Sequence, residues 1–217
     1  MRISVAIDGP AGAGKSTIAK LVAKEFNLMY INTGAMYRAV ALVARENNIE
    51  YTDIEGLCNL IDTLEMRFEN DDLILNDINV QEQITMPEIS AIVSKYASIQ
   101  EVRSKLVKLQ RDMSNKFDVI MDGRDIGTVV LKDSKFKFFL TATPEARAER
   151  RYKELKDRGL TVDYSNILED IIKRDYIDSN REVDPLKKAD DAIEIDTTGL
   201  SISEVTEKIC LNIKNNI

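Results

Sequence analysis

The chain has 217 residues, of which 44% are hydrophobic and 31% charged, and this is the composition of an ordinary soluble globular protein. Its length fits one domain with one core and a smaller insertion. The longest apolar run, residues 39–44, is far shorter than the roughly 20 residues that cross a membrane. The net charge of -7 argues against nucleic-acid polymers as partners, and the absence of histidine excludes His-dependent triads, zinc sites and general bases.

The cysteines and the first residues of the chain indicate in which compartment of the cell we expect the protein. Cys58 and Cys210 lie far apart and form neither a disulfide framework nor a metal-binding spacing. The first residues lead directly into a strand pattern that contains Asp8, so we expect no signal peptide. We therefore expect a cytoplasmic protein without membrane attachment. No large apolar stripe remains once a core is assigned, so we also expect a monomer.

Strand and helix patterns alternate along most of the chain. Strands are predicted at residues 2–8, 28–31, 117–122, 136–142 and 192–196. Helices are predicted at 15–26, 35–46, 54–64, 86–113 with a break near Ser98, 144–158, 165–178 and 201–214. This order predicts an α/β fold in which a parallel sheet is flanked by helices, all within a single domain, 1–217.

Residues 66–85 depart from this alternation. They carry short β-type runs separated by Asn-Asp-Asp and Asn-Asp, which are turn formers. We predict that this segment is a small antiparallel insertion.

A phosphate-binding loop follows the first predicted strand. The sequence GPAGAGKST matches GxxxxGK[ST] in full and opens a predicted helix, which is the context that this motif requires. Backbone N–H groups and the helix N-terminus can bind phosphates, Lys15 can neutralise the outer phosphates, and the Ser16 hydroxyl can bind Mg²⁺. The predicted ATP-binding residues are Gly9, Pro10, Ala11, Gly12, Ala13, Gly14, Lys15, Ser16 and Thr17.

A GTPase switch is the competing interpretation from another class of protein. The chain contains a DxxG string, 53–56, and an NKxD string, 115–118. In a GTPase, both strings should end strands, beside Mg²⁺ and the guanine base. Here Asp53 is predicted to start a helix and Asn115 to end one, so the ordinary interpretation is a helix cap and a connecting loop.

An acceptor site for a second phosphate should be built from arginines, which bind phosphate bidentately and stay charged. Arg38 and Arg124 follow predicted strands, at the edge where α/β proteins bind ligands. Arg174 and Arg181 are seven residues apart and so lie on one face if that segment is helical, and Arg147, Arg151 and Arg158 share one face of the predicted 144–158 helix. A phosphate acceptor has a second pKa near ~6 and is largely deprotonated at neutral pH, so no histidine base is needed.

The carboxylates differ in their predicted roles. Asp122 ends an apolar strand and is the candidate Mg²⁺ ligand together with Ser16. Asp8, directly before the phosphate loop, is predicted to be structural or to anchor the loop. Asp125, directly after Arg124, could accept a hydrogen bond from an amino group of the ligand. Tyr37, Phe138 and Phe139 are predicted to belong to the core, not to a base-stacking site.

Taken together, these motifs resemble the bacterial-type cytidylate kinases, a family of P-loop nucleoside monophosphate kinases. The resemblance is carried by IDGPAGAGKST, NTGAMYRA, DGRDIGTVV, RAERRYKEL and RDYIDSNR, in this order, and it covers about residues 3–210. It implies transfer of the γ-phosphoryl group of ATP to CMP or dCMP with Mg²⁺. It also implies that the 66–85 insertion belongs to a monophosphate-binding lobe and that 144–182 forms a lid.

The resemblance further implies individual roles. Ser94, Arg103 and Asp125 correspond to cytosine readers, Arg174 and Asp178 to sugar contacts, and Arg38, Arg124 and Arg181 to ligands of the acceptor phosphate. The expected catalytic residues are Lys15, Arg124, Arg147, Arg151 and Arg181. Two positions depart from many relatives: Ala11 replaces a serine, and Thr33, a predicted substrate contact, replaces a serine but keeps the hydroxyl. Another small-molecule P-loop kinase and a GTPase-like switch remain the alternatives at this point.

Overall fold

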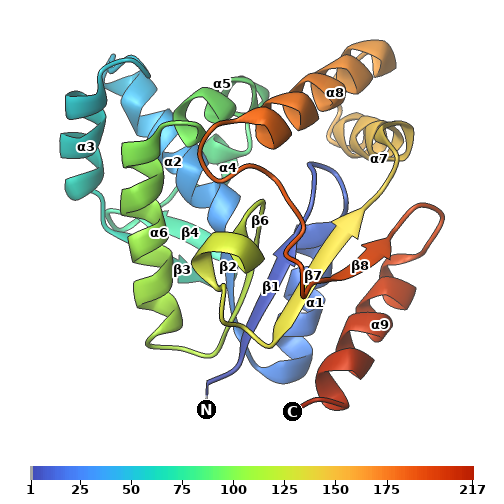
Figure 1. The fold of residues 1–217 in the computed structure, drawn as a ribbon. Helices are drawn as coiled ribbons and strands as arrows, with labels where there is room; N and C mark the ends of the chain where they lie inside the picture. Colours follow the sequence, from blue (N-terminus) through green and yellow to red (C-terminus); the bar gives the residue numbers. More distant parts are fainter. Residues whose placement is uncertain (1) are drawn as a thin grey trace.

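The computed structural model describes residues 2–217, and its centre is a parallel sheet of five strands (Figure 1). The order across the sheet is β2 (Met29–Asn32), β6 (Val119–Gly123), β1 (Ser4–Asp8), β7 (Phe136–Thr141) and β8 (Ile193–Asp196). The strand order differs from the chain order, so the connections cross over the sheet through helices, as parallel strands require. The predicted α/β fold with a parallel sheet is confirmed.

The strand register determines where a ligand can bind. Asp8 at the end of β1 pairs with Gly123, and Asn32 at the end of β2 pairs with Asp122. The carboxyl ends of these three strands therefore lie at one level, and the loops that follow them share one edge of the sheet. Ligands of open α/β sheets bind at this edge.

Alternating side chains of the strands divide the core into two hydrophobic clusters. Val5 and Ile7 of β1 pack with Ile120 of β6 under α1 (Lys15–Phe26) and α9 (Ile202–Lys214). Ala6, Val119 and Met121 point to the opposite face. Both faces of the sheet are thus buried, which explains the continuous apolar runs of these strands in the sequence.

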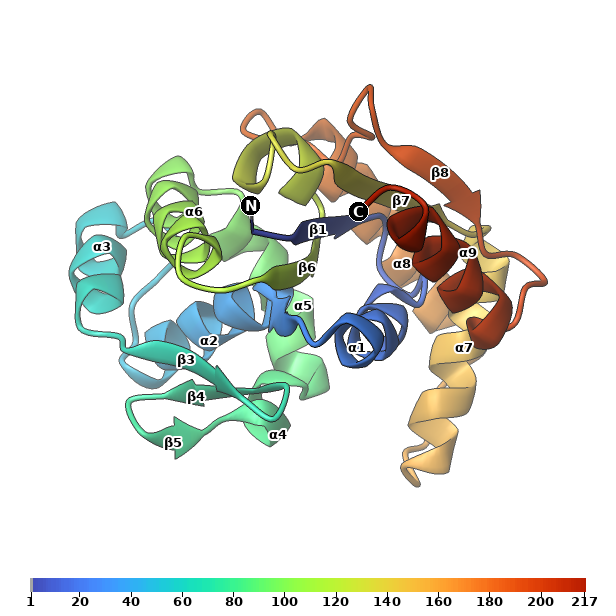
Figure 2. The same cartoon turned by 90° about the horizontal axis from the view of Figure 1, so that it is seen from below.

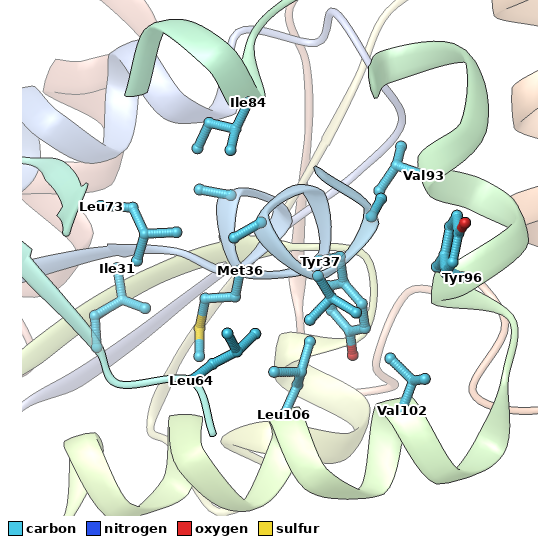
Figure 3. Packing of buried hydrophobic residues seen from close by; sticks show 14 of the residues in the cluster. Ile31, Met36, Tyr37, Leu64, Leu73, Ile84, Val93, Tyr96, Val102 and Leu106 are labelled. Carbon is cyan, nitrogen blue, oxygen red and sulfur yellow. The ribbon is translucent and has the colours of Figure 1, made fainter. Parts of the chain in front are cut away.

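The second cluster surrounds α2 (Thr33–Glu46). Figure 3 shows Met36 and Tyr37 of this helix among side chains of α5 and α6, including Val93 and Leu106. The helices that enclose it are α3 (Ile54–Asp62), α5 (Pro87–Ala97) and α6 (Gln100–Ser114). The predicted break near Ser98 is confirmed, because Ser98 is the C-terminal cap of α5. Tyr37 and Phe138 are core residues as predicted, whereas Phe139 is half-buried.

The insertion forms a separate antiparallel sheet beside α2 (Figure 2), with strands β3 (Met66–Glu69), β4 (Asp72–Leu75) and β5 (Ile78–Asn79). Both hairpin turns consist of Asn-Asp pairs, at 70–71 and 76–77, and all four residues have positive φ. This is the geometry of type I′ turns, which Asn and Asp tolerate well. The prediction was wrong at the end of the segment, where Gln81–Ile84 forms a short helix, α4, that buries Ile84 against the second cluster.

The two helices between β7 and β8 lie above the carboxyl edge of the sheet (Figure 1). They are α7 (Pro144–Asp157) and α8 (Tyr164–Asn180), and they pack against each other. The side chains of Thr143 and Asp163 cap their N-termini.

Several boundaries differ from the prediction by one or two residues, and one element was not predicted. Helix α2 begins at Thr33 and not at residue 35, because Asn32 caps it and accepts from Ala35 N. Strand β6 begins at Val119 and not at residue 117. The π-helix η1 (Ile126–Val130) was not predicted. No helix among residues 2–217 is long and apolar enough to span a membrane.

Gly9 offers a test of the close approach between the phosphate loop and β7. Its φ is 147°, and a Cβ built there would lie 2.1 Å from the Leu140 carbonyl oxygen. The substitution Gly9→Ala must therefore displace backbone, and we expect it to lower the free energy of unfolding by about 2–4 kcal/mol in denaturant titrations. Gly199→Ala is the matched control, since its φ is also positive but no atom lies within 4 Å of the added Cβ. Equal losses in both variants would contradict the contact argument.

Candidate active site

The phosphate loop joins the end of β1 to α1. Gly14 adopts the left-handed conformation (φ 87°, ψ 5°) immediately before the helix, so the first N–H groups of α1 face the loop. The ammonium of Lys15 is buried and donates to the Pro10 carbonyl at 2.7 Å. The Arg147 guanidinium of α7 donates to the Ala11 carbonyl at 3.1 Å and thereby holds the other side of the loop.

A pair of oxygen ligands lies beside the loop. The Ser16 hydroxyl donates to Asp122 Oδ2 at 2.9 Å, and the Tyr30 hydroxyl donates to Asp122 Oδ1 at 2.7 Å. The pKa of Tyr30 is raised by burial and by Asp122, so it remains a protonated donor. A hydroxyl and a carboxylate are hard oxygen ligands of the kind that Mg²⁺ takes. Residues 2–217 contain no group of three or more acidic or cysteine side chains that could hold a metal, so this pair alone fits an ion that keeps water and phosphate ligands.

Asp8 anchors the loop that follows β6, not the phosphate loop itself. Its carboxylate accepts from the N–H groups of Ile126 and Gly127, both at 2.7 Å. These bonds hold the start of η1 against the end of β1. Burial raises the pKa of Asp8 to about 7, although the two N–H donors act in the opposite direction.

Four cationic side chains meet above Asp122. Arg124 Nε donates to Asp178 Oδ2 of α8 at 2.8 Å, and Arg174 Nε lies 3.9 Å from the same oxygen. The buried Nε atoms of Arg38 and Arg174 have no hydrogen-bond partner among residues 2–217. Lys15 completes the group, which we call the cationic cluster. Its four positive charges face two carboxylates, those of Asp122 and Asp178.

The pKa values of Lys15, Arg38 and Arg174 are lowered first by burial and then, for Lys15 and Arg174, by the neighbouring charge of Arg124. Burial, and then the charge of Arg124, lower the pKa of Lys15 well below its usual value. The same two causes lower the pKa of Arg174 to about 10. Burial also lowers the pKa of Arg38. An anion placed among these groups would relieve the repulsion and replace the missing hydrogen-bond partners, so the cluster is built to bind one.

A second ionic group lies on the other side of Arg124. Arg103 of α6 is fully buried, and its guanidinium donates to Asp125, to Asp184 Oδ2 at 2.9 Å and to the Ala97 carbonyl at 3.1 Å. Arg181 Nη2 lies 3.5 Å from Asp125 Oδ1. The structure therefore brings Arg103, Asp125 and Arg181 together, and it places Ser94 one turn before Ala97 on α5.

The arginines of α7 do not act as one face. Arg147 is buried and donates to Asp175 of α8 at 3.0 Å, whereas Arg151 pairs with Glu154 on its own helix and Arg158 is exposed. Arg150 donates to the Thr197 carbonyl at 2.6 Å, next to the phosphate loop. The three arginines therefore differ in burial, and Arg147 is the one that contacts both α8 and the phosphate loop.

Several side chains of the site were missed from the sequence. Tyr30, Asp175 and Asp184 each hold a predicted site residue, Asp122, Arg147 and Arg103 respectively. Asp175 could have been noticed, because it lies between Arg174 and Asp178 in the RDYIDSNR motif. Thr33 was predicted as a substrate contact, and its hydroxyl donates to the Asp122 carbonyl at 2.8 Å.

Comparison with known proteins decides the family. The family model described as "Cytidylate kinase" matches residues 5–215. The chain belongs to the cytidylate kinase family. A cytidylate kinase of Clostridium perfringens (strain SM101 / Type A) is 68% identical over 207 residues, which cover 95% of each chain. A cytidylate kinase of Clostridium tetani (strain Massachusetts / E88) is 62% identical over 217 residues, which cover 100% of this chain and 96% of the relative.

Solved structures of lower identity share the fold alone. A gluconokinase from Sinorhizobium meliloti 1021 is 13% identical, with a TM-score of 0.51 over 99% of this chain and 93% of its own. An uncharacterized protein from Eubacterium ventriosum ATCC 27560 is 15% identical, with a TM-score of 0.57 over the full length of both chains. These likenesses agree with the predicted P-loop kinase fold.

The two GTPase-like strings have structural roles in this cytidylate kinase family member. Asp53 caps the N-terminus of α3 and accepts from Gly56 N at 2.9 Å, and Asn115 caps the C-terminus of α6. Neither lies at the end of a strand. The GTPase interpretation is therefore set aside together with the other small-molecule kinases.

Asp8 gives a pH-dependent prediction. A carboxyl whose pKa is raised in the folded state stabilises the fold below its unfolded pKa, and this stabilisation is lost as the pH rises through the folded pKa. The stability of the wild type minus that of Asp8→Asn should therefore fall by about 2–3 kcal/mol between pH 5 and pH 8. Denaturant titrations at both pH values measure this difference. A difference that stays constant or grows with pH would show that the two N–H donors outweigh burial.

Proposed function

We propose that the protein transfers the γ-phosphoryl group of ATP to CMP and dCMP, and so produces CDP and dCDP in a Mg²⁺-assisted reaction. The observation that carries the proposal is the cationic cluster, which lies beside a complete phosphate loop and holds two buried guanidinium nitrogens without partners. Membership of the cytidylate kinase family supports the choice of acceptor.

The donor side is built from the phosphate loop. Residues 9–17 would bind the ATP phosphates through backbone N–H groups and the N-terminus of α1, and Lys15 would exchange its bond to the Pro10 carbonyl for the outer phosphates. Ser16 and Asp122 would hold Mg²⁺, which supplies neutralisation of phosphate charge when bound. Asp122 is already oriented for this role by Tyr30.

The acceptor phosphate would bind to Arg38 and Arg124. Arg38 offers an unpartnered Nε, and Arg124 is held in place by Asp178, whose carboxylate raises the pKa of this arginine against the effect of burial. Arg174, paired loosely with Asp178, adds a third donor or a contact to the sugar. The site would hold the two phosphates together in a buried, cationic environment. Catalysis would then come from the positioning of the reactants and the neutralisation of their charge, since the acceptor oxygen needs no base.

The cytosine base would be read by Ser94, Arg103 and Asp125. Cytosine presents an N4 amino donor and the N3 and O2 acceptors. Asp125 can accept from N4, and Arg103 can donate to the acceptors. Arg181, which sits 3.5 Å from Asp125, contributes its charge on this side as well as toward the acceptor phosphate.

The segment 144–182 would act as the lid over the phosphates. Arg147 connects α7, α8 and the phosphate loop through Asp175 and the Ala11 carbonyl, so movement of these helices would be transmitted to the donor site. Arg151 would turn from Glu154 toward the transferring phosphoryl group. The 66–85 insertion belongs to the monophosphate-binding lobe in this proposal. We propose a cytoplasmic monomer, in line with two free cysteines, Cys58 and Cys210.

The decisive experiment measures ADP release from MgATP with each nucleoside monophosphate in turn. We expect turnover with CMP and dCMP to exceed that with AMP and GMP by orders of magnitude. Lys15→Met is the negative control, and we expect it to lose turnover because it removes the charge that faces the outer phosphates. Wild-type turnover in this variant, or a preference for a purine monophosphate, would overturn the proposal.

Asp125 provides a test of base recognition. A carboxylate only accepts hydrogen bonds, and uracil presents an acceptor, O4, where cytosine presents N4. Loss of a hydrogen bond to a charged group costs about 1.5–3 kcal/mol, or roughly 10- to 150-fold. Asp125→Asn should therefore lower kcat/KM for CMP and narrow the CMP/UMP ratio by tenfold or more.

The control must separate recognition from folding, because Asp125 also pairs with Arg103 and Arg181. Asp191→Asn removes a carboxylate that pairs with Lys137 at 2.7 Å, and we expect it to leave the CMP/UMP ratio unchanged. An equal fall for both acceptors in Asp125→Asn would assign Asp125 to the support of the two arginines.

A further inference from the structure

The loop that follows α8 has an unusual backbone at Asp184. This residue is not glycine, yet its φ is 48°, in the left-handed region. Its carbonyl accepts from Arg181 Nε at 2.7 Å, and the N–H of Leu186 donates to the Asp178 carbonyl at 2.7 Å. The two bonds fold residues 181–186 back onto the end of α8.

The carboxylate of Asp184 meets Arg103, a residue of α6 that is 81 positions earlier in the chain. Asp184 Oδ2 accepts from Arg103 Nε at 2.9 Å. The Arg103 side chain is 1% exposed, whereas that of Asp184 is 28% exposed. Asp184 is thus the outer partner of a buried guanidinium, and it reaches that guanidinium from a different part of the chain.

Each nitrogen of the Arg103 guanidinium has one partner. Nε donates to Asp184, Nη1 to the Ala97 carbonyl and Nη2 to Asp125. Because Nη1 and Nη2 carry two hydrogens each, one N–H on each remains for other acceptors. Three partners around a planar group fix its plane, and Asp184 is the partner at Nε.

We infer that Asp184 is a positioning residue for recognition of the acceptor nucleotide: its side chain orients Arg103 and its backbone orients Arg181. The inference rests on the proposed function, because it takes Arg103 as a donor to the base. Asp184 itself contacts two arginines and acts on the nucleotide through them. It also joins the segment after α8 to α6, so the base-reading group is assembled from both.

The two contacts of Asp184 can be separated by substitution. Asp184→Gly keeps the left-handed backbone, and therefore the carbonyl bond to Arg181, but it removes the carboxylate. Asp184→Asn keeps an oxygen acceptor in the same place without the charge, and asparagine also tolerates this conformation. Asp191→Gly is the matched control, since it removes another carboxylate that pairs with a buried cation, Lys137, outside the site.

Steady-state kinetics with CMP and with ATP as the varied substrate test the inference. In Asp184→Gly we expect KM for CMP to rise about tenfold, while kcat and KM for ATP stay within twofold of the wild type. Asp184→Asn should recover part of the loss, with KM for CMP raised about threefold. Asp191→Gly should leave all three constants within twofold, and thermal melting of each variant reports its fold.

A double-mutant cycle asks whether Asp184 acts through Arg103. In an Arg103→Lys background, Asp184→Gly should change KM for CMP by less than twofold, because the side chain that it orients is gone. If Arg103→Lys does not fold, the single variants still decide the matter. An unchanged KM for CMP in Asp184→Gly, or an equal rise in KM for ATP, would overturn the inference. Absence of CMP turnover in the wild type would instead overturn the proposed function.

Discussion

The rest of the site depends on one constraint. Positively charged side chains are buried close together at one edge of the sheet. Lys15, Arg38, Arg124 and Arg174 lie close together in a poorly solvated space, and burial together with the charge of Arg124 lowers the pKa values of Lys15 and Arg174. The fold tolerates it because Asp122 and Asp178 lie among them. Binding energy from a phosphate ligand would be used here most effectively, since the unliganded cluster is already strained by its own charge.

The main sheet and the helices contribute different parts of this arrangement. The register of β1, β6 and β2 sets Asp122, the phosphate loop and the start of α2 at one level. The opposing carboxylate, Asp178, comes from α8, far later in the chain. Helix α8 also supplies Arg174, so the cationic cluster is complete only when α8 lies over the sheet edge. The ion pair between Arg124 and Asp178 joins α8 to the turn after β6, in addition to the contact between α7 and α8.

The sequence predicted what depends on local pattern. The GxxxxGK[ST] motif, the apolar strands and the Asn-Asp turns each carry their structural cause within a few residues, so the loop, the sheet and the insertion could be predicted. The π-helix η1 could not, because it is fixed by Asp8, more than a hundred positions earlier. For the same reason Tyr30 and Asp184 escaped notice: neither belongs to a motif, and their importance comes from side chains that only the fold brings near.

The site is divided by charge into two halves that match the two halves of a nucleotide. In the base-reading group, which consists of Arg103, Arg181, Asp125 and Asp184, two positive charges are balanced by two negative charges. In the cationic cluster, four cations face two carboxylates. A neutral base fits the half of the site that has no net charge. The paired groups there offer directional hydrogen bonds and do not favour the binding of other anions. A phosphate fits the half with excess positive charge. The boundary between them is the peptide bond from Arg124 to Asp125, so in the proposed function one turn after β6 would set both the polarity in which a nucleotide binds and the position of its phosphate.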